Sequence, residues 1–327
     1  MPKVLISPAP LFGIQAEFLD VLKKAGLEPT YPKKRAQLTE PELLEELQGI
    51  HGCIAGSEPY TRKVLAAHPQ FKVIARAGVG YDAVDCQAAT DHGVAVCIAP
   101  GTNQDAVAEH TFAMILALAK NLISQHAGTV AGKWPRNANL PLRGRVLGIA
   151  GMGRIGKAVA VRGQAFGMKM LAFEPYPDHD FAKQYGVTFV PWERLLAESD
   201  YVSLHMPMTA QAKHAINRKT LAMMKPSAFL VNTARGGLVC EADVVEALKA
   251  KKIAGVGLDV FEEEPPRVDQ PLFQLDNVVF TPHAAGVDVQ SRDDMALSAA
   301  HAIVSLMRGE WPAEKVMNPE VKGKFKW

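Results

Sequence analysis

The sequence predicts an α/β protein that contains two doubly wound parallel sheets. Short runs of Val, Ile, Leu and Ala alternate with amphipathic stretches of helical length, which is the pattern of β-α-β units. The runs form two series, and 327 residues are more than one typical core accommodates. Strands are expected at 4–7, 53–55, 73–75 and 94–96 in the first series, and at 146–150, 170–173, 201–204, 229–232, 255–259 and 278–280 in the second.

A helical stretch separates the two series. Between residues 103 and 119, Val107, Thr111, Phe112 and Ile115 recur at helical spacing, so this stretch is expected to begin the second domain. Segment 289–307 is also helical in pattern, and no strand pattern follows it, so we expect it to return to the first domain. The prediction is a discontinuous first domain at 1–102 and 285–327, an inserted domain at 103–284, and a cleft between them.

Composition excludes several classes of protein. With 48% apolar and 21% charged residues and a net charge of +2, the chain resembles an ordinary globular protein without a footprint for nucleic acid or an anionic membrane. It contains no apolar run of about 18 residues, and its first residues lack the order of a signal peptide, so a cytoplasmic location is expected. The four cysteines are widely spaced, which indicates neither disulfides nor a metal site.

A glycine-rich turn follows the strand at 146–150. Gly151, Gly153 and Gly156 form G-x-G-x-x-G between an apolar strand and a helical stretch, which is the context of a Rossmann dinucleotide site. The first glycine permits the tight turn, the second lets the backbone approach a pyrophosphate, and the third packs helix on strand. The helix N-terminus then offers free N–H groups to the phosphates.

An acidic residue follows at the expected distance. Glu174 lies 23 residues after Gly151 at the end of the next strand, where a carboxylate binds the adenosine ribose hydroxyls. A carboxylate repels the 2′-phosphate of NADP, and no Lys or Arg follows before Lys183. NAD is therefore favoured as the cofactor, although Glu174 could instead be a solvated acid at a strand end.

Three further residues each lie just past an apolar run: Arg235 in VNTARGG, Glu264 in LDVFEEEPP and His283 in TPHAAG. Residues beyond strand C-termini gather where ligands bind in open α/β sheets. The Arg fork suits a substrate carboxylate, the His can exchange a proton with a carbonyl oxygen, and a carboxylate can orient the His. Singly, each is more often structural, and spacing alone does not say which glutamate of 262–264 faces inward.

Seven motifs together resemble the NAD-dependent D-isomer-specific 2-hydroxyacid dehydrogenases, in their phosphoglycerate dehydrogenase-like branch, over nearly the whole chain. In order, they are RAGVGYDAVD, VAEHT, GMGRIG, HMPMT, NTARGG, LDVFEEEP and TPHAAG. The resemblance implies hydride transfer between NAD(H) and C2 of a D-2-hydroxy or 2-oxo acid. It implies Arg235 as substrate-binding residue, His283 as acid and base, and Glu264, directly before Pro265, as its partner.

The resemblance also implies roles for other residues. The first domain would bind substrate, and the second would bind NAD and carry a dimerisation arm at about 103–141. Arg154 and Ile155 would lie at the pyrophosphate and Asp259 at the nicotinamide carboxamide. Met206, Pro207, Thr233, Ala234 and Gly286 would line the cofactor, while Arg76, Val79 and Gly80, together with Trp134 and Arg136 of a homodimer partner, would contact substrate.

The identity of the acid stays open at this stage, as does the physiological direction. Arg76 and Arg136 could bind the phosphate of 3-phosphoglycerate, but Glu58 in loop 55–61 would repel it, and Ala55 stands where relatives that use phosphoglycerate tend to have a basic residue. A glyoxylate or hydroxypyruvate reductase is an equal alternative. NAD-sensing corepressors and phosphite dehydrogenases share this pattern, whereas formate dehydrogenases have Gln where Glu264 stands.

Overall fold

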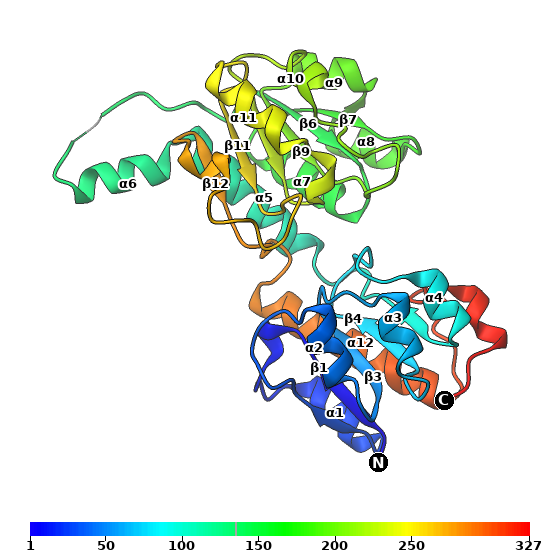
Figure 1. Ribbon diagram of the computed structural model, residues 1–327. Helices are drawn as coiled ribbons and strands as arrows, with labels where there is room; N and C mark the ends of the chain where they lie inside the picture. Colours follow the sequence, from blue (N-terminus) through cyan, green and yellow to red (C-terminus); the bar gives the residue numbers. More distant parts are fainter. Residues whose placement is uncertain (135) are drawn as a thin grey trace. The chain divides into compact units, whose positions relative to one another are not determined.

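The computed structural model describes residues 1–134 and 136–327. Over these residues the chain divides into two compact units (Figure 1). Unit 1 comprises Met1–Asn103 and Val287–Trp327, and unit 2 comprises Gln104–Gly286. Each unit contains a parallel sheet with helices on both faces, which confirms the predicted fold class.

The sheet of unit 1 contains five strands among the described residues. All its pairings are parallel, and the order is β2-β1-β3-β4-β5, a flavodoxin-like arrangement. Val4 and Ile6 belong to one apolar cluster and Leu5 to another, because successive side chains alternate between the two faces. The strands are β1 (Lys3–Ile6), β2 (Glu28–Thr30), β3 (Ile50–Ala55), β4 (Val73–Arg76) and β5 (Ala95–Cys97).

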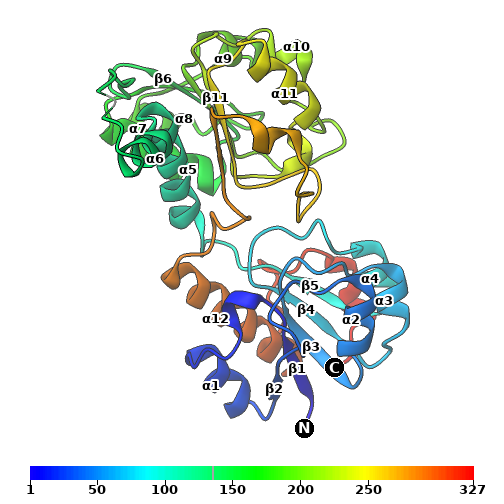
Figure 2. The ribbon, with the colours of Figure 1, turned by 60° about the vertical axis from the view of Figure 1, so that its left-hand side comes forward.

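Helices cover both faces of this sheet. Helices α1 (Glu17–Lys24) and α12 (Val289–Met307) lie side by side, and α12 packs on β3 and β4 (Figures 1 and 2). The C-terminal helix thus contributes to the core of the N-terminal sheet. The other face is covered by α2 (Glu40–Glu46), α3 (Arg62–Ala66) and α4 (Cys86–Asp91), and the short helices η1 (Ala9–Leu11) and η4 (Pro319–Gly323) complete the unit.

The sheet of unit 2 is parallel throughout and has the order β12-β11-β10-β9-β6-β7-β8 over the described residues. The chain runs outward from β6 to β8 and then returns to build β9 to β12 on the other side, so the topological switch point lies between β6 and β9. The strands are β6 (Val146–Ala150), β7 (Lys169–Phe173), β8 (Val187–Phe189), β9 (Tyr201–Leu204), β10 (Phe229–Asn232), β11 (Gly255–Leu258) and β12 (Val278–Phe280).

Two apolar clusters cover the faces of this sheet. One contains residues of α5 (Gln104–Ala119) and α7 (Arg154–Ala165), and the other contains residues of α9 (Trp192–Glu198), α10 (Arg218–Leu221) and α11 (Glu241–Lys249). Figure 1 shows α6 (Leu122–Val130) extending away from the sheet, and none of its described residues is buried. The remaining elements are α8 (His179–Tyr185), η2 (Gly236–Leu238) and η3 (Pro271–Gln274).

Two strands were absent from the sequence prediction. Strands β2 and β8 each contain three residues and lie at a sheet edge. Among the described helices, none alone is long and apolar enough to cross a membrane, and only α5 and α6 taken together, across a bend of 59°, reach that length and composition.

Candidate active site

The glycine-rich turn lies at the switch point of the unit 2 sheet. Gly151 has φ +95°, and a Cβ there would lie 2.7 Å from the backbone of His205, which follows β9. A Cβ at Gly156 would lie 2.0 Å from the Gly151 carbonyl oxygen, whereas at Gly153 it would meet no described atom within 4 Å. The two enclosed glycines let β6, α7 and the β9 loop pack closely, and the open one leaves space for a pyrophosphate at the start of α7.

Glu174 lies beside this turn. It directly follows β7, and its Oε2 accepts a hydrogen bond from the Met152 N–H at 2.8 Å. Its Oε1 accepts one from the Tyr176 N–H at 3.1 Å. Each carboxylate oxygen has a second lone pair, so the group can still accept from ribose hydroxyls. The residues present therefore fit a dinucleotide without a 2′-phosphate.

The other residues expected at the cofactor follow strands of the same sheet. Arg154 and Ile155 are the first residues of α7, and Met206 and Pro207 follow β9. Thr233 and Ala234 follow β10, and the Thr233 hydroxyl lies 3.0 Å from that of Thr111 on α5. Gly286 is the last residue of unit 2. Their contacts with the cofactor stay predictions.

Asp259 follows β11 and is fully buried. Its carboxylate accepts hydrogen bonds from the Thr281 hydroxyl at 2.6 Å and from the Ala284 and Ala285 N–H groups at 2.8 and 3.0 Å. The Thr281 hydroxyl also lies 2.9 Å from His110 Nε2 of α5. These contacts hold the turn that carries His283, so Asp259 determines the local backbone around the histidine.

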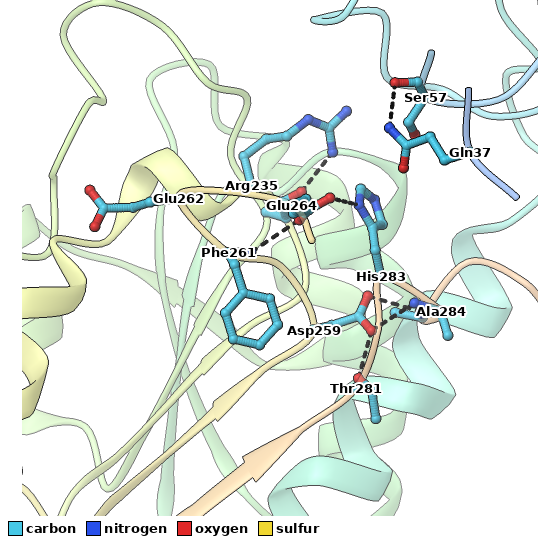
Figure 3. A network of polar contacts seen from close by, with 12 residues as sticks. Gln37, Ser57, Arg235, Asp259, Phe261, Glu262, Glu264, Thr281, His283 and Ala284 are labelled. Atoms are coloured by element: carbon cyan, nitrogen blue, oxygen red, sulfur yellow. Dashed lines mark hydrogen bonds and ion pairs between the residues drawn. The ribbon is translucent and has the colours of Figure 1, made fainter. Parts of the chain in front are cut away.

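Glu264 and His283 form a close pair in unit 2 (Figure 3). Their Oε2 and Nδ1 atoms are 2.6 Å apart, and the side chains are 28% and 43% exposed respectively. The His283 N–H donates to the Asp259 carbonyl oxygen at 2.7 Å, and its φ of +52° lies in the left-handed region that few non-glycine residues adopt. Because Nδ1 faces the carboxylate, Nε2 is the ring nitrogen available to a substrate.

Electrostatics favour the ionised form of Glu264. Burial raises the pKa of Glu264, but the hydrogen bond and charge of His283, the Phe261 N–H and the charge of Arg235 lower it more strongly. The Phe261 N–H donates to Glu264 Oε1 at 3.0 Å. The pKa of this carboxyl consequently lies below its usual range, and the group is ionised at neutral pH.

The ambiguity among the three glutamates has a structural answer. Glu262 points away from His283, while Glu264 faces the imidazole (Figure 3). Arg235 lies on the neighbouring loop after β10, and its Nη1 donates to the Ala234 carbonyl oxygen at 2.6 Å. A Cβ at Gly236 would lie 1.8 Å from the Phe261 carbonyl oxygen, so the Arg235 and Glu264 loops are in direct backbone contact.

The residues expected to contact substrate in unit 1 surround the ends of β3 and β4. Arg76 is 8% exposed, and it donates from Nε to the Gly80 carbonyl oxygen at 2.7 Å and from Nη1 to the Ala55 carbonyl oxygen at 3.2 Å. Glu58 is 1% exposed, and burial, opposed by neighbouring N–H groups and Arg76, raises its pKa. Arg76 thus joins the two loops, and substrate contacts of Arg76, Val79 and Gly80 stay predictions.

Trp134 and Arg136 lie in the segment that follows α6, and both are exposed, Trp134 to 79%. Within residues 1–134 and 136–327, no three His, Cys, Asp or Glu side chains are arranged to hold a metal ion. The cysteines at 53, 86, 97 and 240 are free thiols that are buried or partly buried.

Sequence reasoning missed several residues of this site. Glu241 and Gln270 hold the segment that carries Glu264, and His110 and Thr281 support the His283 turn. His110 belongs to the VAEHT motif, so its position in a motif was a usable signal. Glu241 and Gln270 lie outside all seven motifs.

Taken with its glycine-rich turn, the unit 2 sheet defines a dinucleotide-binding domain, and comparison with known proteins gives the family. Residues 112–285 match the model of the D-isomer specific 2-hydroxyacid dehydrogenase NAD-binding domain. The chain is 41% identical over 272 residues to a glyoxylate reductase of Korarchaeum cryptofilum, covering 81% of this chain and 82% of that protein. The chain therefore belongs to the D-isomer specific 2-hydroxyacid dehydrogenase family, which is a family of oxidoreductases, and its cofactor is NAD.

Other relatives differ in length and in the acid that they are named for. The chain is 38% identical to a D-3-phosphoglycerate dehydrogenase of Archaeoglobus fulgidus over 90% of its own length, but it spans only 56% of that protein. The structure of D-lactate dehydrogenase from Aquifex aeolicus complexed with NAD and lactic acid matches with a TM-score of 0.85 and 29% identity, covering 96% of this chain and 99% of that one.

Proposed function

We propose that this chain reduces a small 2-oxo acid at C2, with His283 as proton donor, Glu264 as its partner and Arg235 as the residue that binds the substrate carboxylate. The observation that carries the proposal is the 2.6 Å contact between Glu264 and His283 Nδ1, which leaves Nε2 for the substrate oxygen. The Arg235 loop is packed against the Glu264 loop through Gly236, which supports a shared site.

The protein residues have distinct tasks in this reaction. When bound, NADH supplies the hydride that reaches the carbonyl carbon. Protonated His283 donates its Nε2 proton to the carbonyl oxygen, and the resulting neutral imidazole keeps its Nδ1 proton on the Glu264 side. Arg235 offers a planar fork of N–H donors to the carboxylate of the acid. In the oxidative direction, neutral His283 removes the hydroxyl proton.

A small, unphosphorylated acid such as glyoxylate or hydroxypyruvate is favoured over 3-phosphoglycerate. Arg76 donates hydrogen bonds to the carbonyl oxygens of Ala55 and Gly80. The buried carboxyl group of Glu58 lies close enough to interact with the charge of Arg76. The similar glyoxylate reductase, at 41% identity, also supports a small acid. The second candidate substrate, 3-phosphoglycerate, is supported by the D-3-phosphoglycerate dehydrogenases, at 38% and 40% identity.

We also propose that unit 1 binds the substrate, that α6 and the following segment form a dimerisation arm, and that Trp134 and Arg136 act in a partner subunit. Leu122, Ile123 and Val130 of α6 are 56% to 75% exposed, which supports an apolar surface for a second copy. The cytoplasmic location stays a prediction from the sequence. Sedimentation of the protein and of Ile123→Glu tests the arm, because a dimer should dissociate when a charge enters its apolar interface.

A kinetic screen tests the proposed reaction. NADH oxidation is followed with glyoxylate, hydroxypyruvate, phosphohydroxypyruvate and other 2-oxo acids, and NAD reduction with the D-hydroxy acids and phosphite. His283→Ala should lose turnover while keeping NADH affinity, whereas Arg235→Ala should also raise KM for the acid, because a charged group that binds a carboxylate contributes about 2 kcal/mol. Near-normal turnover by His283→Ala refutes the role of His283, and no turnover with any acid favours a cofactor-sensing protein.

A further inference from the structure

One buried carboxylate holds the segment that carries Glu264 at both of its ends. Glu241 is the first residue of α11 and is 6% exposed. Its Oε1 accepts from the Glu262 N–H at 2.6 Å, and its Oε2 accepts from Gln270 Nε2 at 2.5 Å. The Glu241 N–H donates in return to Glu262 Oε2 at 3.2 Å. We call Glu241, Glu262 and Gln270 the Glu241 clamp.

A histidine adds a further contact to the Glu241 clamp. His214 Nε2 lies 2.6 Å from Glu262 Oε1, and the His214 N–H donates to the Gly237 carbonyl oxygen at 2.8 Å. These contacts turn the Glu262 side chain away from His283 and leave Glu264, two residues further on, to face the imidazole (Figure 3). The register of the three glutamates is thus determined outside the Glu264–His283 pair.

The environment of Glu241 is unfavourable for an acid. Burial raises the pKa of Glu241, the charges of Glu262, Glu263 and Glu264 raise it further, and the hydrogen bond from the Glu262 N–H opposes them. A buried acid among like charges costs free energy. A buried glutamate of this kind is expected where its two carboxylate oxygens accept hydrogen bonds that the fold requires. Both oxygens of Glu241 accept hydrogen bonds from the segment 262–270.

We propose that Glu241 is a positioning residue for the reaction, which acts by holding Glu264 at hydrogen-bond distance from His283 Nδ1. The inference rests on the proposed function, because it assumes that His283 exchanges the proton. Loss of the Glu241 clamp frees both ends of the segment, and Glu264 then spends less time at the imidazole. The expected result is a fall in kcat for reduction and a displaced pH profile, with KM for NADH unchanged.

The test compares variants with different hydrogen-bonding capacity. Glu241→Ala loses both contacts, whereas Glu241→Gln can keep both, because the Gln270 amide can turn over and present its oxygen to the new NH₂ group. Gln270→Ala loses one contact at a partly exposed site and serves if Glu241→Ala does not fold. Glu246→Ala removes an exposed carboxylate from the same helix and is the control.

Each variant has a distinct expected result. Glu241→Ala should lower kcat for 2-oxo acid reduction about tenfold and move the alkaline limb of its pH profile to lower pH, since small misplacements of catalytic groups are costly. Gln270→Ala should lose about threefold, and Glu241→Gln and Glu246→Ala less than about twofold.

Several outcomes overturn the inference. If Glu241→Ala lowers only the melting temperature, or if Glu241→Gln is as impaired as Glu241→Ala, the residue is structural. An unchanged profile in Gln270→Ala has the same meaning. His283→Ala, measured alongside, separates the proposed function from the positioning role. Near-normal turnover by His283→Ala refutes the proposed function. If His283→Ala loses turnover while Glu241→Ala keeps the kcat and pH profile of the unchanged protein, only the positioning role is refuted.

Discussion

Replacing Glu264 by glutamine removes the charge opposite His283 while conserving the shape of the side chain. In the structure, Glu264 accepts from the Phe261 N–H through Oε1 and faces His283 Nδ1 through Oε2, 2.6 Å away. A glutamine has one accepting oxygen, so it can serve only one of these partners. If it keeps the Phe261 contact, it turns its NH₂ group toward the imidazole, which can then accept that bond only when Nδ1 carries no proton.

The size of the effect follows from the contact and its exposure. A hydrogen bond to a charged group contributes about 1.5–3 kcal/mol, and the 28% and 43% exposure of the two side chains favours the lower end, about 1.5 kcal/mol. Since about 1.4 kcal/mol corresponds to a factor of ten in rate, Glu264→Gln should lower kcat for reduction about tenfold. The charge of Glu264 favours the protonated imidazole that reduction needs, so the alkaline limb of the reductive profile should move to lower pH in this variant.

The oxidative reaction should shift in the same direction. Oxidation needs neutral His283, so in Glu264→Gln the acid limb of the oxidative pH profile should also move to lower pH. The assay is kcat against pH in both directions, followed by NADH absorbance, with Glu263→Gln as the neighbouring control because that side chain is exposed. Unchanged limbs in Glu264→Gln, or the same displacement in Glu263→Gln, would refute the assignment of Glu264 as partner.

Three further predictions concern the glycine-rich turn, cofactor choice and a buried acid. Gly156→Ala should lower the melting temperature, because its Cβ would lie 2.0 Å from the Gly151 carbonyl oxygen and overpacking costs about 1–3 kcal/mol. Gly153→Ala should melt normally but bind NADH more weakly, because its Cβ would enter the space left for the pyrophosphate. The reverse pattern contradicts the assigned roles. Glu174→Ala should increase kcat/KM with NADPH relative to NADH, and an unchanged ratio would exclude a part for Glu174 in selectivity. Burial raises the pKa of Glu58, so the folded state favours the protonated carboxyl group and loses stability as pH rises through that pKa. Glu58→Gln should therefore raise the melting temperature more at pH 8 than at pH 4. Thermal melts that show a larger gain at pH 4 would contradict this.

The sequence was informative where contacts are local or strands are buried. Strands such as Val146–Ala150 and Phe229–Asn232 have helices on both faces, so they appear as continuous apolar runs and were predicted at their observed bounds. Strands β2 and β8 lie at sheet edges and contain only three residues, and β2 includes Pro29, so neither has a distinctive pattern. The glycine-rich turn was predictable because its three glycines lie within six residues, directly between a strand and a helix, although Gly151 also packs against the distant His205 backbone.

The orientation of the glutamates could not be predicted from periodicity. Segment 262–270 lies outside regular strands and α-helices, so no repeat assigns its side chains to a face. The choice of Glu264 depends on contacts from Glu241, 21 positions before Glu262, and from His214, 48 positions before it. Only the resemblance to a family, which encodes such distant contacts in a motif, singled out Glu264, the glutamate that faces His283 in the structure.

Hydrogen bonds within unit 2 hold the Glu264–His283 pair, and this has a kinetic consequence. Asp259 fixes the His283 turn through buried hydrogen bonds, and the Phe261 N–H fixes the Glu264 carboxylate. In the proposed reaction, a proton donor that the protein itself holds in order contributes mainly to the chemical step. Substitutions that loosen the pair should accordingly lower kcat with little change in KM. Changes at Arg235, for which we propose binding of the substrate carboxylate in both ground and transition states, should raise KM. This division of effects between the two loops is what a single site formed after β10, β11 and β12 predicts, and equal effects on KM from both loops would contradict it.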